Sequence, residues 1–100
     1  MPSSKRETRE ILGEKGQVLA SAEFLDDVLD GPSRVYSPDG VLTQESTYQG
    51  GELHGHFQAW WNNGMPKESG SFDKGRRIGL YRWFKEDGSL WQEHDYGPAL

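Results

Sequence analysis

Large apolar side chains recur along this chain at a spacing of 24 residues, with polar turn residues between them. Two columns of aromatic positions and two columns of glycines share that spacing, and no insertion or deletion interrupts it. The recurring positions are Phe24, Tyr48, Phe72 and Tyr96; Leu12, Tyr36, Trp60 and Phe84; Gly31, Gly55 and Gly79; and Gly16, Gly40, Gly64 and Gly88. The chain is therefore predicted to consist of internal repeats of 24 residues, and the side chains of the aromatic columns are predicted to form the core.

Each repeat unit has the pattern of a β-hairpin. Residues 55–61 form a run rich in aromatic rings, residues 62–64 have the turn sequence Asn-Asn-Gly, and residues 65–72 form a second extended run. Glycine at each turn supplies the positive φ that tight hairpin turns require. Helical spacing of apolar residues fits only residues 20–29, where the repeat register favours a strand. The pattern predicts an all-β fold of antiparallel hairpins.

The last two units have a motif that resembles a known repeat. Residues 55–75 have the sequence Gly-x-Phe-x-x-Trp-Trp-x-Asn-Gly-x-x-Lys-Glu-x-Gly-x-Phe-x-x-Gly, and residues 79–90 have Gly-x-Tyr-x-x-Phe-x-x-Asp-Gly-x-Leu. This motif resembles the MORN repeat variant (membrane occupation and recognition nexus), which is common in bacterial antitoxins of toxin–antitoxin systems. The resemblance covers nearly the whole chain and is strongest over residues 31–96. It implies an elongated, single-layer meander sheet.

The repeat register divides the chain into four units and two tails. In the first unit Glu7 replaces the leading glycine and Leu12 replaces the aromatic residue, so that a hairpin and a helix both remain open there. Such a departure is typical of a capping repeat. The predicted boundaries are 1–6 for a polar N-terminal tail, 7–30 for the degenerate capping repeat, 31–54, 55–78 and 79–96 for three MORN-like hairpin repeats, and 97–100 for a C-terminal tail.

The composition narrows the classes of function. Four Trp and four Tyr residues favour a folded chain of 100 residues. Without cysteine there is no disulfide framework or thiol nucleophile, and a reducing, cytoplasmic location is expected. The polar N-terminal stretch has no apolar signal segment, and no apolar run is long enough to span a membrane. The net charge of −5 argues against nucleic acid as a ligand.

The sequence offers little catalytic chemistry. His54 and His56 alternate along a predicted strand, but with no cysteine and only His94 besides, no metal site is expected. The Ser-Gly-Ser segment at residues 69–71 lacks the strand-turn-helix context of a nucleophile elbow. The glycines recur at turn spacing and no helix follows them, so they form no phosphate-binding loop. The chain is therefore expected to be non-catalytic and to use no cofactor.

Two tryptophans occupy columns that do not require a large aromatic ring. Trp61 shares its column with Gly13, Ser37 and Lys85, and Trp91 shares its column with Leu19, Thr43 and Lys67. Because Trp is enriched among interface hot spots, Trp61 and Trp91 are candidate partner contacts. Strand alternation is expected to put Phe57, Tyr81 and Trp83 on the Trp61 side, where they extend the candidate patch.

Charge is unevenly distributed along the chain. Residues 7–30 carry seven acidic and two basic side chains, whereas residues 55–78 carry four basic and two acidic ones. Such runs commonly lie on solvated turns, and an acidic end can also steer a basic partner. The candidate electrostatic contacts are Glu23, Asp26, Asp27 and Asp30 at the acidic end, and Lys74, Arg76 and Arg77 at the basic turn.

Three classes of function fit these features. An extended repeat surface is typical of a binding platform, and the resemblance implies a module that binds and blocks a partner protein, such as an antitoxin or immunity protein acting on a toxin. The second class is association with anionic membrane lipid through the basic turn. It is less favoured than protein binding, because three basic residues contribute only about 1 kcal/mol each to binding a membrane. Homo-oligomerisation through open sheet edges, as a structural scaffold, is the third class.

Overall fold

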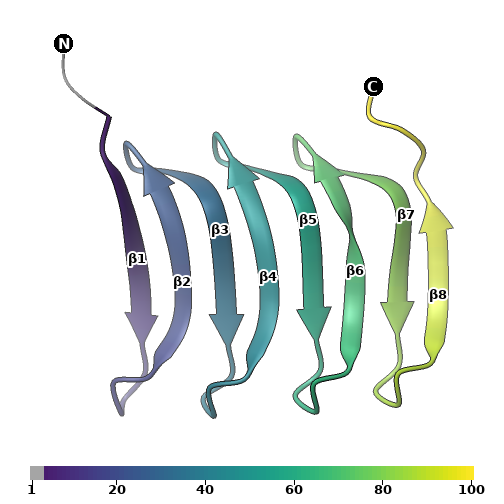
Figure 1. The fold of residues 1–100 in the computed structure, drawn as a ribbon, viewed down its shortest axis with the longest axis horizontal. Coiled ribbons are helices and arrows are strands. Elements are labelled where there is room, and N and C mark those ends of the chain that lie inside the picture. The colour runs from purple at the N-terminus through teal and green to yellow at the C-terminus, as the bar shows by residue number, and fades with distance from the viewer. Residues whose placement is uncertain (1–3) are drawn as a thin grey trace.

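The computed structural model describes residues 4–100 as one eight-stranded sheet, in which each strand pairs antiparallel with the next. The order is β1 to β8 without a crossover, so the chain is an open meander of hairpins (Figure 1). The strands are β1 Arg6–Leu12, β2 Val18–Leu25, β3 Val28–Tyr36, β4 Leu42–Gln49, β5 Glu52–Trp60, β6 Pro66–Asp73, β7 Arg76–Phe84 and β8 Leu90–Asp95. The molecule measures 50 × 43 × 11 Å, and its shortest dimension, 11 Å, corresponds to the thickness of a single sheet. The predicted all-β, single-layer meander is confirmed.

The lower turns in Figure 1 join β1 to β2, β3 to β4, β5 to β6 and β7 to β8, and they repeat one geometry. In the third, the Trp61 N–H donates to the Met65 carbonyl (2.8 Å) and the Gly64 N–H donates to the Trp61 carbonyl (2.9 Å). Gly64 has a φ of 88°, a conformation that side chains disfavour. The positive φ predicted for the glycines of this column is confirmed.

The upper turns contain two residues each, and both have positive φ. They lie at Asp26 and Asp27, at Gly50 and Gly51, and at Lys74 and Gly75. Two positive φ values are the signature of a type I′ turn, whose twist matches that of antiparallel strands. The helix considered for residues 20–29 is absent, because β2 and β3 meet there at the first upper turn.

The first unit, left open by the sequence, is also a hairpin. β1 pairs with β2 from Arg6 opposite Leu25 to Leu12 opposite Val18. Residues 1–3 of the predicted N-terminal tail lie outside the described residues. In the part of the chain that the structure describes, no helix is long and apolar enough to cross a membrane.

One face of the sheet carries most of the aromatic contacts. Cross-strand partners share a face, and the register places Phe24, Tyr48, Phe57 and Phe72 together with Tyr81 and Trp83. We call this side the aromatic face. With no second layer, burial is limited: only Ala59, Phe72 and Tyr81 are buried apolar residues in the described chain.

The predicted core was therefore partly wrong. Phe72 of the first aromatic column is buried, but Tyr96 of the same column is 41% exposed. Trp60 of the second column is only half-buried. Burial concentrates instead on β5, β6 and β7, where Tyr81 is fully buried.

The burial of Tyr81 depends on a glycine in the neighbouring strand. A Cβ on Gly70 would lie 2.0 Å from Cδ2 of Tyr81, so the ring packs directly on the Gly70 backbone. In the corresponding pair of β2 and β3, Ala22 faces Ser33, and between β4 and β5, Ser46 faces Phe57. The small residue on one strand thus accommodates a larger one on the next.

We predict that Gly70→Ala destabilises the fold by about 1 to 3 kcal/mol, the usual cost of overpacking. The methyl group would overlap a ring that has no free space to enter. Gly13→Ala is the matched control, since its Cβ would meet only the flexible Gln17 side chain. Urea denaturation of both variants measures the difference, and equal stability would contradict the packing described for Tyr81.

Gly64→Val should cost more than about 1 kcal/mol, because a β-branched side chain is strongly disfavoured at positive φ. A Cβ on Gly64 would meet no atom within 4 Å, so the loss would reflect backbone strain and not a clash. Gly64→Asn should lose less stability than Gly64→Val, since Asn tolerates positive φ. Equal melting temperatures for Gly64→Val and the wild type would refute the turn assignment.

Candidate binding surface

Six rings on the C-terminal half of the aromatic face form a continuous row. Phe57 contacts Phe72 (centroids 5.8 Å apart), Phe72 contacts Tyr81 (5.8 Å), and Tyr81 contacts both Trp83 (4.9 Å) and Tyr96 (6.1 Å). His94 completes the row beside Tyr96 at 4.5 Å. Most of these pairs have the edge-to-face geometry that aromatic rings prefer. We call these six residues the aromatic row.

The structure brings three of the five predicted contact residues together in this row. Phe57 and Trp83 are half-buried there and present part of their rings to solvent. Tyr81 is 0% exposed, so it supports the row from within and offers no surface of its own. Whether Phe57 and Trp83 contact a partner stays a prediction.

The other two predicted contacts lie apart from the row. Trp61 is in the third lower turn, where Lys67 covers its ring at 4.7 Å and its indole N–H donates to the Phe84 carbonyl (3.3 Å). Trp91 lies in the edge strand β8 and is 64% exposed. Trp61 directly follows the end of β5, and the β5–β6 register shifts between Ala59 and Trp60, leaving Lys67 as the extra residue on β6. That Trp61 shares the Phe57 side stays a prediction.

Two charged residues on the row were not recognised from the sequence as part of it. The Arg77 guanidinium lies over Tyr81 (4.9 Å), Phe72 (5.7 Å) and Trp83 (5.9 Å). The Tyr81 hydroxyl donates to Glu68 Oε2 at 2.5 Å. Burial, and then this hydrogen bond, raises the pKa of Tyr81 above its ordinary value.

The repeat columns contain the signal for these two residues. Arg77 stands where the earlier units have Leu29 and Leu53. Glu68 stands in a column whose other members are Ala20, Gln44 and Gln92. A charge in an otherwise apolar or uncharged column marks a site that the repeat itself does not require.

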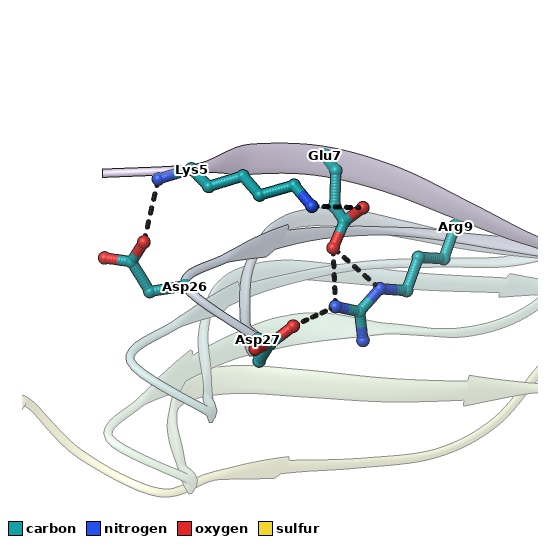
Figure 2. Close-up of polar contacts among 5 residues, drawn as sticks. All are labelled: Lys5, Glu7, Arg9, Asp26 and Asp27. Atoms are coloured by element: carbon teal, nitrogen blue, oxygen red, sulfur yellow. Dashed lines mark hydrogen bonds and ion pairs between the residues drawn. The ribbon is translucent and has the colours of Figure 1, made fainter. Parts of the chain in front are cut away.

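The acidic cluster is engaged within the chain. Lys5 donates its backbone N–H to Asp26 (2.7 Å), and Arg9 bonds to both Glu7 and Asp27 (Figure 2). Arg6 pairs with Glu23 (2.8 Å) and Asp30 (3.1 Å). The Gly50 N–H, followed by Arg6, lowers the pKa of Asp30. These four carboxylates therefore fasten β1 to the sheet, and fewer of them are left to steer a partner.

The basic turn has a different environment. Lys74, Arg76 and Arg77 line a hollow of about 370 Å³ at the upper edge of the sheet, together with one acidic residue, Asp73. Tyr96 and the C-terminal residues Pro98 and Leu100 form its other side. Here basic side chains and apolar groups meet in one concave surface.

The N-terminal half of the aromatic face is a shallow trough. Its lining includes the small residues Ala20, Ala22 and Ser33 and the larger Phe24 and Leu29. Arg9 also lines it, with its guanidinium 4.2 Å from the centre of the Phe24 ring. The hollow measures about 400 Å³. The aromatic face thus carries the row at one end and this hollow at the other.

The histidines are dispersed over the sheet. His54 lies beside Asp73, with Nδ1 3.3 Å from Oδ1, whereas His94 is in the aromatic row. Within residues 4–100, no group of three or more His, Cys, Asp or Glu side chains is arranged to hold a metal ion.

Comparison with known proteins identifies the repeat at two places. The family described as MORN repeat variant matches residues 29–49 and 77–96. These segments occupy equivalent positions of the 24-residue period and correspond to the hairpins β3–β4 and β7–β8. No curated protein and no solved structure matches the chain. The two matched hairpins support a MORN repeat protein, a kind of repeat that generally serves as a binding module for proteins or membranes.

Proposed function

We propose that this chain is a non-catalytic protein-binding module that docks a partner protein on the aromatic face. One observation carries the proposal: a single-layer sheet presents a row of aromatic rings on a face that no other element of the described chain covers. Aromatic residues are enriched at the centres of protein interfaces. A flat, open surface of this kind suits a protein partner better than a small substrate, which needs an enclosed site.

The total exposed surface supports the same proposal. The chain exposes 6833 Å², whereas a compact monomeric protein of 11.3 kDa exposes about 5,700 Å². The excess of about 1,100 Å² is larger than the roughly 800 Å² that each partner buries in a standard interface. A partner that covers one face of the sheet would therefore reduce the exposed area to about that of a compact protein of the same mass.

The two halves of the aromatic face have complementary roles in this proposal. Trp83 and Phe57 serve as anchors, since both rings are partly exposed and rigidly held by neighbouring rings. The trough over Ala20, Ala22 and Ser33 receives a projecting element of the partner. Blocking of the partner, as an antitoxin or immunity protein would block a toxin, is the specific form of binding that we propose.

Trp83→Ala should weaken partner capture by about tenfold or more, as loss of a hot-spot residue does. Ala59 occupies the same repeat position in the third unit, so the sheet is expected to tolerate alanine there. Wild-type and variant proteins would be used as baits in a lysate of the native host, with mass spectrometry of the captured proteins. Leu80→Ala, an exposed residue on the opposite face, is the control.

The same capture experiment separates the three classes of function. A protein that is captured by the wild type and the Leu80→Ala control but lost with Trp83→Ala would support the proposal. Retention on anionic vesicles with no captured protein would favour lipid association. Sedimentation that shows concentration-dependent self-association would favour a scaffold of identical copies, and either result would contradict the proposal.

Acrylamide quenching tests the exposure of the two outlying tryptophans. In single-Trp variants, Trp91 should be quenched more readily than Trp61, because Lys67 covers the Trp61 ring and nothing comparable is seen over Trp91 in residues 4–100. Exposure keeps Trp91 available as an additional contact. Equal shielding of Trp91 and Trp60 in a monomer would exclude Trp91 from that role.

A further inference from the structure

The hollow beside the basic turn has cations without strong ionic partners. In residues 4–100, Lys74 and Arg76 form no ion pair. Arg77 Nη2 lies 3.9 Å from Glu68 Oε2, beyond hydrogen-bonding distance, and that same oxygen accepts the Tyr81 hydroxyl at 2.5 Å. The basic residues of β1, by contrast, all bond to carboxylates.

Arg77 is held in place by the aromatic row. Its guanidinium lies within 6 Å of the Phe72, Tyr81 and Trp83 centroids, the range of cation–π attraction. These contacts restrict the side chain before any ligand arrives, while 42% of it stays exposed. Leucine in the same column of two earlier units shows that the fold does not require a charge here.

A guanidinium fixed by stacking is suited to one class of ligand. The planar fork of an arginine matches a carboxylate through two parallel hydrogen bonds. Lys74 and Arg76 add two further positive charges at the same hollow, and Tyr96 and Pro98 supply an apolar wall. Asp73 is the one acidic residue of the lining and lies beside His54, with Oδ1 3.3 Å from Nδ1, so positive charge still predominates. A segment with acidic and apolar side chains would complement both features.

We propose that this hollow binds aspartate or glutamate side chains of the partner protein, with Arg77 as the residue that determines specificity. The inference rests on the proposed function, because it names the chemistry of the partner docked on the aromatic face. A protein carboxylate fits better than a membrane surface, since three cations contribute only about 1 kcal/mol each to binding anionic lipid.

The test uses the full chain and a fluorescein-labelled short peptide of alternating Glu and Leu, with a Lys and Leu peptide as the opposite probe. Fluorescence anisotropy should show binding of the acidic peptide only. Arg77→Leu, the residue that the repeat uses elsewhere, should weaken binding about tenfold. Arg76→Gln, which leaves the aromatic row intact, should also weaken it, and Lys85→Gln at a distant lower turn should stay within about twofold of the wild type.

Circular dichroism and melting temperature verify that each variant is folded. Failure of the acidic peptide to bind, or equal binding by Arg77→Leu and wild type, would overturn the inference. So would binding to phosphatidylserine vesicles that Arg77→Leu abolishes while the acidic peptide does not bind.

The lysate experiment distinguishes this inference from the proposed function. A protein captured equally by wild type and by the Arg76→Gln/Arg77→Leu double variant, but lost with Trp83→Ala, would overturn the carboxylate site and uphold the proposed function. Peptide binding that depends on Arg77, with no protein captured by the wild type, would contradict the proposed function and uphold the carboxylate site.

Discussion

A single-layer sheet has no second layer in which to bury its side chains, so each hairpin must find apolar contacts in the neighbouring hairpins. In this chain the requirement is met chiefly by Tyr81, which packs on the backbone of Gly70 and against Phe72 and Trp83. The Tyr81 hydroxyl is satisfied by Glu68, so burial of the ring leaves no polar atom without a partner. The remaining strands extend outward from this contact.

The repeat spacing predicts the strands and turns well, for a physical reason. Positive φ is a local requirement of the backbone at the lower turns, and glycine occupies these positions because it adopts positive φ without strain. The positions are Gly16, Gly40, Gly64 and Gly88. The alternation of side chains between the two faces of each strand likewise follows from the pleated backbone. The resemblance of the motif adds the single-layer arrangement, which the β1–β8 order confirms.

The candidate site was less predictable, because it depends on register and on contacts between units. Trp61 follows the end of β5 and contacts Lys67 and the Phe84 carbonyl, and the motif alone does not predict these contacts. Pairing of Arg6 and Arg9 with the acidic cluster depends on how β1 aligns with the first upper turn. Tyr81 was predicted as a contact residue and is fully buried, because its neighbour is Gly70 and not a larger residue.

The two ends of the sheet use charge in different ways. At β1, ion pairs fasten the edge strand, and charged side chains there also discourage pairing with another sheet. At the upper turn between β6 and β7, the cations have weak ionic partners, and the exposed ring of Tyr96 lies beside them. The charged residues that stabilise the fold thus lie at the β1 end of the sheet, whereas those available to a partner lie toward the β8 end.

Amide hydrogen exchange followed by NMR tests most directly whether stability is centred on the Tyr81 contact. In a repeat protein whose units touch only their neighbours, local opening is easiest where few contacts are lost. We expect the slowest exchange in β5, β6 and β7 and faster exchange in β1 and β8. Slowest exchange in β1 and β2, or equal protection across all eight strands, would contradict it.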